Sequence, residues 1–129
     1  MRELGDMLKE GLRYTSRMVV DDAHTAAMMG SGDMAVLATP AMLSLMENAA
    51  MLAVVDHLPE GATTVGGHIA SSHLKPSPVG AEVSATAELT KVEGRKLHFK
   101  VVAHEGETLI GEGTHLRFVV DRQKFLSNL

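Results

Sequence analysis

The sequence contains no cysteine, and this absence excludes disulfide bonds and any chemistry that depends on a thiolate. Tryptophan is also missing, and aromatic residues make up only 3% of the 129 residues. The core must therefore be filled mainly by aliphatic side chains and by some of the nine methionines, which pack adaptably. Composition leaves two interpretations of the methionines open: core filler, or the lining of an apolar ligand pocket.

A block of basic residues is absent as well. The net charge is −4 and both signs are interspersed, so nothing here would neutralise phosphates and no nucleic-acid partner is expected. The first eleven residues, MRELGDMLKEG, mix charges without a long apolar run, so we expect no signal peptide. The most apolar stretch, around 41–55, is interrupted by Ser44, Glu47 and Asn48, so no membrane span is expected. Together with the lack of cysteine, these features favour a cytoplasmic location.

The strongest local signal is a predicted helix over residues 40–57, rich in Ala, Leu and Met and free of Gly. Thr39 and Pro40 match an N-cap followed by proline at the first helical position, and the segment 59–61 ends the helix. The helix is apolar around most of its circumference, so we expect it to be buried with a sheet wrapped around it. No repeat or linker interrupts the chain, which predicts one domain over residues 1–129.

Period-two patterns predict β-strands around this helix. They cover residues 12–20, 63–74, 81–92, 96–104 and 108–120. In the strand 81–92, apolar and polar residues alternate, which predicts one face on the core and one in water. Gly94 and Gly106 mark tight turns, so the last three strands should form an antiparallel meander. A loop or short helical turn is expected at 21–33, and a short helix at 121–129.

One strand, one long buried helix and four antiparallel strands predict an α+β hotdog fold. In this architecture a curved antiparallel sheet of about five strands wraps a single central helix. Such a sheet has open edges, and pairing two protomers covers one of them. We therefore expect a homodimer.

Glu47 is the most informative single residue, because it lies in the middle of an otherwise apolar helix. A carboxylate there is either buried or lines a cavity, and burial without a partner costs several kcal/mol. Glu47 is therefore either satisfied by a neighbouring donor in a structural role or used in chemistry.

Thr39 and His73 are the other two candidate catalytic residues. Thr39 is the expected N-cap, and its hydroxyl also lies at the positive end of the helix dipole, where an oxyanion is stabilised. Helical spacing places Thr39 and Glu47 about two turns apart with an offset of roughly 80°, so they can face one cavity without touching. His73 shares a strand face with Ile69 and Ser71 and is either a half-buried structural residue or a base.

The remaining histidines are weaker candidates. His68 and His115 lie in predicted strands, and no role is assigned to His24, His57, His98 and His104. Their spacing matches no metal-ligand motif, and no metal is expected. A glycine-rich phosphate loop and a GxSxG nucleophile elbow are also absent.

Three segments resemble the fluoroacetyl-CoA thioesterase family of hotdog enzymes, and the resemblance runs from about residue 12 to residue 125. They are TPAMLSLMENAA at the helix, VGGHIASSHLKPSPVG in the next strand, and the meander, where AELTKVEGRKL is followed by IGEGTH. The resemblance implies a thioester hydrolase that cleaves a short or small acyl-CoA. Coenzyme A is then part of the substrate, and no separate cofactor is expected.

The same resemblance implies roles for five residues. The family's catalytic threonine, glutamate and histidine fall on Thr39, Glu47 and His73. Its strand glycine and the arginine after the GTH tract fall on Gly66 and Arg117, which implies substrate binding. Thr39 would polarise the acyl carbonyl or attack it, Glu47 would attack or activate water, and His73 would act as general acid and base. The nucleophilic and the general-base routes both stay open.

One departure from the family lies just before Thr39. The phenylalanines that close the fluoroacetyl enzyme's site are absent from AAMMGSGDMAVLA, residues 26–38, so fluorine selectivity is not expected to carry over.

Two rival functions also stay open. A hotdog hydratase or dehydratase would use a carboxylate and a histidine on acyl thioesters, but it needs no hydroxyl at Thr39. A non-catalytic dimeric module could bind acyl-CoA or another small ligand in the Met-rich interior.

Overall fold

The computed structural model describes residues 4–129; residues 1–3, the start of the segment MRELGDMLKEG, lie outside it. The chain runs through α1 (Leu4–Met7), β1 (Arg13–Val19), η1 (Asp22–His24), α2 (Ala26–Met29), α3 (Thr39–Val54), η2 (Val55–His57), β2 (Ala62–His73), β3 (Glu82–Glu93), β4 (Lys96–Glu105), β5 (Thr108–Asp121) and α4 (Arg122–Ser127). The predicted strands, the central helix and the short terminal helix are confirmed, with ends shifted by up to three residues. The short helix α1 was not predicted.

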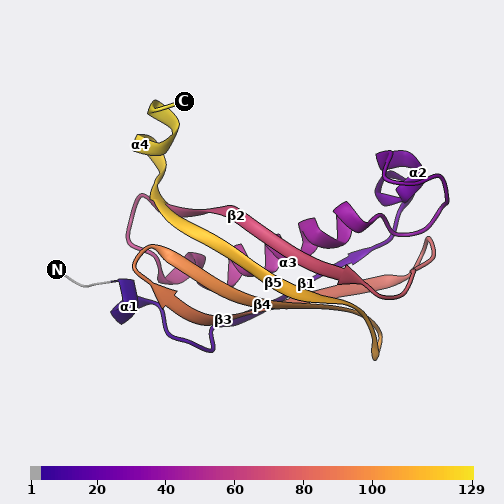
Figure 1. Cartoon of the computed structure of the whole chain (residues 1–129), viewed down its shortest axis with the longest axis horizontal. Coiled ribbons are helices and arrows are strands. Elements are labelled where there is room, and N and C mark those ends of the chain that lie inside the picture. Colours follow the sequence, from indigo (N-terminus) through magenta and orange to yellow (C-terminus); the bar gives the residue numbers. More distant parts are fainter. Residues whose placement is uncertain (1–3) are drawn as a thin grey trace.

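All five strands form one antiparallel sheet in the order β1-β3-β4-β5-β2, which curls around α3 (Figure 1). Because β3, β4 and β5 are consecutive neighbours joined by tight turns, the predicted meander is confirmed. The register shifts near Gly66, near Thr90 and near His104, and such bulges increase the twist and bending of a sheet. The strands β1 and β2 form the two edges. The arrangement is the predicted α+β hotdog fold.

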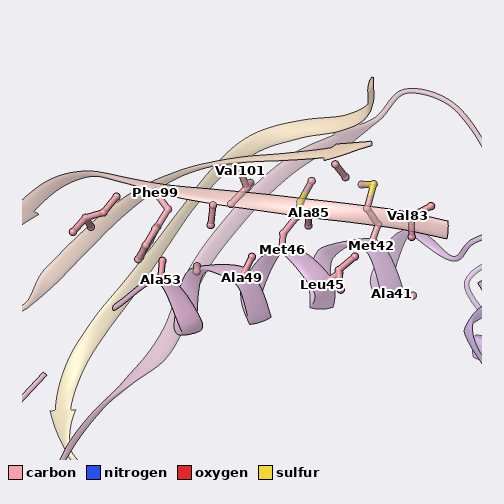
Figure 2. Close-up of a cluster of buried hydrophobic side chains, with 14 of the residues drawn as sticks. Ala41, Met42, Leu45, Met46, Ala49, Ala53, Val83, Ala85, Phe99 and Val101 are labelled. Atoms are coloured by element: carbon pink, nitrogen blue, oxygen red, sulfur yellow. The ribbon is translucent and has the colours of Figure 1, made fainter. Parts of the chain in front are cut away.

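The core lies between α3 and the concave face of the sheet. Figure 2 shows one face of α3 packed against β3 and β4. This cluster includes Ala41, Met42, Leu45, Met46, Ala49, Ala53, Val83, Ala85, Phe99 and Val101. Small alanines on the helix let it approach the sheet, while Met42 and Met46 fill the space with only 1% and 0% exposed. Met42 and Met46 are therefore core filler, whereas Met28 and Met34 are exposed.

Two glycines of β5 let the edge strand β2 pack closely. A Cβ on Gly113 would lie 1.9 Å from the carbonyl oxygen of Ala70, and one on Gly111 would lie 2.6 Å from the sulfur of Met42. At Gly113 no side chain fits without moving the backbone of β2, and at Gly111 the buried Met42 side chain would have to shift. The IGEGTH tract therefore has a structural reason, which is the close contact of β5 with β2 and α3.

The start of α3 differs from the prediction in one respect. Thr39 is the first helical residue, and Ala38 is the N-cap, with extended backbone angles and no side-chain cap. The prediction that Thr39 caps the helix is therefore wrong. The helix begins one residue earlier than expected, so the Thr39 hydroxyl is available for another partner.

Candidate active site

The hydroxyl of Thr39 contacts the imidazole of His73. Oγ1 of Thr39 lies 2.7 Å from Nδ1 of His73, a hydrogen-bond distance between residues 34 positions apart in the chain. Thr39 opens α3 and His73 closes β2, so the contact joins the helix N-terminus to the end of an edge strand. A hydroxyl held against an imidazole is the arrangement that activates a nucleophile or holds a hydroxyl donor in place.

Backbone hydrogen bonds fix the segment that enters α3. The N–H of Leu37 donates to the carbonyl of Ser77 at 2.9 Å, and the N–H of Ala38 donates to the carbonyl of His24 at 2.9 Å. Val36 also forms an isolated bridge with Pro78. The chain just before Thr39 is thereby tied to the chain just after His73. The contact between the two side chains rests on this backbone framework.

The surroundings of His73 favour its neutral imidazole. Burial lowers the pKa of His73, and the backbone of Lys75 opposes this shift to a smaller extent. The Nε2 atom is buried, and among residues 4–129 no hydrogen bond of standard geometry reaches it. At neutral pH the ring is therefore mostly unprotonated, and Nδ1 can accept a proton from the hydroxyl of Thr39.

A cavity of about 280 Å³ opens beside this pair. Its lining includes Ala26, Ser31, Val36, Leu37, Thr39, His73, Leu74, Lys75 and Pro76. One wall comes from α2 and the loop that follows it, which is the segment 26–38 that lacks aromatic residues. Met28 and Met34 of this segment point outward, with 72% and 67% exposed, and they do not line the cavity. The segment 26–38 therefore contributes no aromatic and no methionine side chain to this cavity.

Glu47 lies farther along α3 and faces Arg117. The side chain of Glu47 is 43% exposed, so it lines an open region instead of being buried. Its Oε2 lies 3.8 Å from Nη1 of Arg117, which is within ion-pair range but longer than a hydrogen bond. Arg117 is buried, and burial lowers its pKa while Glu47 opposes the shift. An arginine remains protonated even so, and Glu47 is its near counter-charge.

Gly66 forms the third side of the Glu47 cluster. A Cβ at this position would lie 2.7 Å from Oε2 of Glu47, 3.4 Å from Nη1 of Arg117 and 3.5 Å from Cε1 of His115. Only the absence of a side chain lets the carboxylate approach the strand. Gly66 also precedes the register shift of β2, so the backbone bends at this cradle.

Two residues of this cluster were not among the predicted site residues. Thr64 accepts from Nε of Arg117 with its hydroxyl at 2.8 Å and from Nη2 with its carbonyl at 3.0 Å. Nε2 of His115 lies 3.3 Å from Nη1 of Arg117. A signal for both exists in the sequence, because strand alternation puts His115 on the same face as Arg117, and Thr64 on the same face as Gly66.

The predicted site residues thus form two clusters within one protomer. Thr39 contacts His73, whereas Glu47 lies with Gly66 and Arg117. Eight residues of helix separate Thr39 from Glu47, a rise of about 12 Å along the axis. The two side chains therefore do not touch, as their helical spacing predicts.

Two of the other histidines make local contacts with carboxylates. His24 pairs with Asp21, and His98 lies 3.0 Å from Glu93, both near the surface. Among residues 4–129, no three His, Asp or Glu side chains gather as metal ligands. Over the same residues, no helix is long and apolar enough to cross a membrane.

A larger cavity of about 690 Å³ lies at the other end of the sheet. It is lined mainly by apolar side chains of α1, the start of β2 and the end of β5, with Arg95 from the β3–β4 turn. It contains none of the predicted site residues, and in Figure 1 its elements lie at the end opposite α2. Size alone does not make it the catalytic site, because chemistry needs the polar groups found at the smaller cavity.

Solved structures of similar fold define the class of this protein. A hypothetical protein of Thermus thermophilus, described as a thioesterase superfamily member, superposes with a TM-score of 0.87 and 27% identity, covering 99% of this chain and 92% of that one. A threonine-to-serine variant of the fluoroacetyl-CoA thioesterase in complex with acetyl-CoA superposes with a TM-score of 0.88 and 35% identity, covering 94% and 96%. The fold is that of a hotdog-fold thioester hydrolase.

The sequence comparisons narrow this class to one family. The model of the family described as fluoroacetyl-CoA-specific thioesterase matches residues 20–123. The fluoroacetyl-CoA thioesterase of Streptantibioticus cattleyicolor is 38% identical over 126 residues, which cover 93% of this chain and 91% of the relative. The chain belongs to the fluoroacetyl-CoA-specific thioesterase family, and the predicted resemblance is confirmed.

Proposed function

We propose that this chain hydrolyses a short or small acyl-CoA thioester to the free acid and coenzyme A, without a separate cofactor. The observation that carries the proposal is the 2.7 Å contact between the Thr39 hydroxyl and Nδ1 of His73 beside a cavity. Support also comes from relatives of known structure, one in complex with acetyl-CoA and another with fluoroacetate and CoA. All of these ligands belong to the acyl-CoA class or are products of its hydrolysis.

Thr39 and His73 supply the acyl-transfer half of the proposed reaction. Nδ1 of His73 takes the hydroxyl proton as Oγ1 of Thr39 attacks the thioester carbonyl carbon. The oxygen of that carbonyl gains charge near the positive N-terminal end of α3, which stabilises it. When the carbon–sulfur bond breaks, His73 returns the proton to the departing thiolate of coenzyme A.

Glu47 activates water for the second step of the proposed reaction, the hydrolysis of the acyl group from Thr39. Its carboxylate is partly exposed and has no hydrogen-bond partner within bonding distance among the described residues, so it is free to accept a proton from water. The resulting hydroxide attacks the acyl carbon and the bond to Oγ1 of Thr39 breaks. The proton of the acid product passes through His73 to Oγ1, which restores the Thr39 hydroxyl, and Glu47 releases its proton to solvent. Gly66 and Arg117 line the space beside Glu47, where we propose that they contact the substrate.

The proposed substrate has a short or small acyl group that need not be fluorinated. The cavity beside Thr39 is about 280 Å³, at the lower limit of small-molecule sites. The wall formed by residues 26–38 has no aromatic side chain that would screen the acyl group. The proposal therefore covers small acyl-CoA thioesters as a class.

The proposed enzyme works as a homodimer paired through the β2 edge. Within one protomer, eight residues of α3 separate Thr39, beside His73, from Glu47, a rise of about 12 Å. One thioester carbonyl cannot reach both clusters across that distance. Antiparallel pairing of β2 with the same strand of a second copy brings the partner's Glu47 closer to His73. This pairing also covers the open edge of the sheet.

A substrate screen with free-thiol detection tests the proposed activity. Wild type is expected to release thiol from short saturated acyl-CoA thioesters, and folded Thr39→Ala, Glu47→Gln and His73→Ala variants are expected to lose it. Arg13→Gln, an exposed change on β1, is the control and should keep wild-type turnover. If all three site variants keep wild-type turnover while folded, the proposed assignment is wrong.

The two rival functions give different results in the same screen. A hydratase would remove the enoyl absorbance of an enoyl-CoA without releasing thiol. A binding module would retain acyl-CoA and release no thiol over hours. A cytoplasmic location and the absence of a nucleic-acid partner stay predictions.

Subunit mixing tests the proposed dimer. Thr39→Ala and Glu47→Gln proteins are inactive alone, but a re-assorted mixed dimer holds one intact site if Glu47 acts across the interface. Partial recovery of thiol release on mixing is expected. A monomer in analytical ultracentrifugation, or a dimer without recovery, would contradict the shared site.

A further inference from the structure

His115 is a buried group that the proposed chemistry leaves without a task. It lies on β5 with 1% exposed, and its ring packs beside Phe99 with centroids 6.1 Å apart. Nδ1 of His115 lies 2.7 Å from the carbonyl oxygen of His68, and Nε2 lies 3.3 Å from Nη1 of Arg117. A carbonyl only accepts and a guanidinium only donates, so Nδ1 carries the proton and Nε2 offers its lone pair. These contacts fix one neutral tautomer.

The charges around His115 favour the same neutral form. Burial lowers the pKa of His115, and the positive charge of Arg117 lowers it further, while the His68 carbonyl and Glu47 oppose the shift. The His68 side chain adds a small lowering effect. A second proton on Nε2 would point at the guanidinium of Arg117. The imidazole therefore serves as an acceptor toward Arg117.

Arg117 is held on two sides, and only one of them faces Glu47. Its Nε and Nη2 donate to the hydroxyl and carbonyl of Thr64 at 2.8 and 3.0 Å. Its Nη1 is shared between Nε2 of His115 at 3.3 Å and Oε2 of Glu47 at 3.8 Å. Only the first distance is a hydrogen bond, so His115 anchors Nη1, which carries two N–H groups, at a position too far from the carboxylate for a second hydrogen bond. Glu47 keeps its oxygens free while a positive charge stays close.

The second hydrogen bond of His115 supports the bend in β2. The register of β2 shifts between Gly66 and His68, and the carbonyl of His68 accepts from His115. Gly66 is the residue whose missing side chain makes room for Glu47, since a Cβ there would lie 2.7 Å from Oε2. One imidazole thus holds both the arginine and the strand segment that border the carboxylate.

We propose that His115 is a positioning residue: it holds Arg117 and the β2 bend so that the Glu47 carboxylate stays unpaired beside a fixed positive charge. This inference rests on the proposed function of Glu47. It predicts that losing the acceptor of His115 lets Nη1 of Arg117 close on Glu47. The guanidinium then holds Oε2 in a hydrogen bond and fixes the carboxylate away from the attacking water, so turnover falls although substrate binding is kept.

Three substitutions separate the two hydrogen bonds of His115. His115→Gln keeps an acceptor near the position of Nε2, and we expect kcat within about 3-fold of wild type. His115→Asn keeps a donor near Nδ1 but loses the acceptor, and His115→Phe keeps only the ring packing. For these two we expect kcat lowered by about 10- to 100-fold with KM within about 3-fold. Phe99→Leu is the control: it disturbs the packing beside His115, lowers Tm and keeps kcat within about 2-fold.

Two results would overturn the proposal. One is wild-type kcat in folded His115→Asn and His115→Phe proteins. The other is a loss of kcat that is proportional to the loss of Tm in all three His115 variants and in Phe99→Leu. That result would show that His115 affects turnover only through packing. If the buried variants do not fold, long-range ¹H–¹⁵N spectra of the wild type decide: a proton on Nε2 of His115 at neutral pH overturns the proposal. Absence of thiol release by wild type from every acyl-CoA would refute the proposed function, whereas these spectra report on His115 independently.

Discussion

The substitution Gly66→Ala tests the Glu47 cluster at a single atom. Its Cβ would lie 2.7 Å from Oε2 of Glu47, whereas an ordinary contact of this kind is about 3.5 Å. The carboxylate must therefore move by about 0.8 Å. A misplacement of about 1 Å costs up to about 100-fold in rate, so we expect kcat to fall by roughly 30- to 100-fold.

The same substitution should leave the fold nearly as stable as wild type. The clash is with the end of a flexible side chain that is 43% exposed, so Glu47 can turn toward solvent. Replacing glycine by alanine also restricts the unfolded chain, which stabilises by about 0.4–1 kcal/mol where the backbone allows it. Gly66 has no positive φ, so the backbone allows it. We expect the free energy of unfolding within about 1 kcal/mol of wild type.

Two other glycines, one next to Gly66 and one on β5, are matched controls for Gly66→Ala. In Gly67→Ala the new Cβ meets the ring of Phe118, which is 37% exposed and can turn, so kcat should stay within about 3-fold. In Gly113→Ala the Cβ lies 1.9 Å from the backbone oxygen of Ala70, so we expect a loss of about 3 kcal/mol or more. Thiol release and urea unfolding measure the two effects. Wild-type kcat in Gly66→Ala would refute the reasoning, as would equal kcat losses in Gly66→Ala and Gly67→Ala.

Three further predictions concern protonation and the buried guanidinium. Burial lowers the pKa of His73, and the neutral imidazole is the active form in the proposed reaction. In a pH–rate profile, kcat/KM should therefore rise with pH, and the midpoint of this rise should lie below 6.5. A midpoint above 6.5 would contradict this. Burial also lowers the pKa of His115, so the unfolded chain binds more protons just below pH 6.5, and the free energy of unfolding from urea titrations should decrease as the pH is lowered through that range. Arg117→Lys leaves the acceptors of Thr64 and His115 without matching donors, so the free energy of unfolding in urea should fall by about 2–4 kcal/mol. The exposed Arg13→Lys is the control and should stay within about 0.5 kcal/mol of wild type. Equal stabilities of the two variants would refute the role of the guanidinium fork.

The architecture could be predicted from the sequence because its signals are local. An Ala- and Met-rich helix without glycine, followed by four alternating segments with Gly94 and Gly106 at the turns, leaves few arrangements open. Both glycines have positive φ, as such turns require. The helix α1 was missed because four residues carry little periodicity.

The site was predicted in part. Glu47 stands out because a carboxylate interrupts an apolar helix, and the structure places its Oε2 3.8 Å from Nη1 of Arg117. The contact of Thr39 with His73 spans 34 positions, and no local pattern encodes a contact over that distance. The cap prediction for Thr39 failed because a threonine before a proline fits the N-cap and the first helical turn equally well. Cap geometry distinguishes the two, and it assigns the cap to Ala38.

The sequence pattern of β5 contains a signal that favours a site role for His115 more strongly than its rank as a weaker candidate indicates. On β5 the polar His115 and Arg117 alternate with the apolar Leu116 and Phe118, which reverses the usual order of a core-facing strand. Two polar residues on a buried face need partners, and here they serve each other and Thr64. Such a reversal marks a polar cluster inside a fold, although which partners fill it depends on the strand register.

The central claim, thioester hydrolysis with Glu47 as the group that acts on water, is tested most directly by one measurement. It is the steady-state release of free thiol from a short saturated acyl-CoA by wild type and by Glu47→Gln, which has the same shape. The account predicts clear release by wild type and a loss of at least about 100-fold in the folded variant. Equal rates in the two proteins, or no release by wild type from any acyl-CoA, would contradict it.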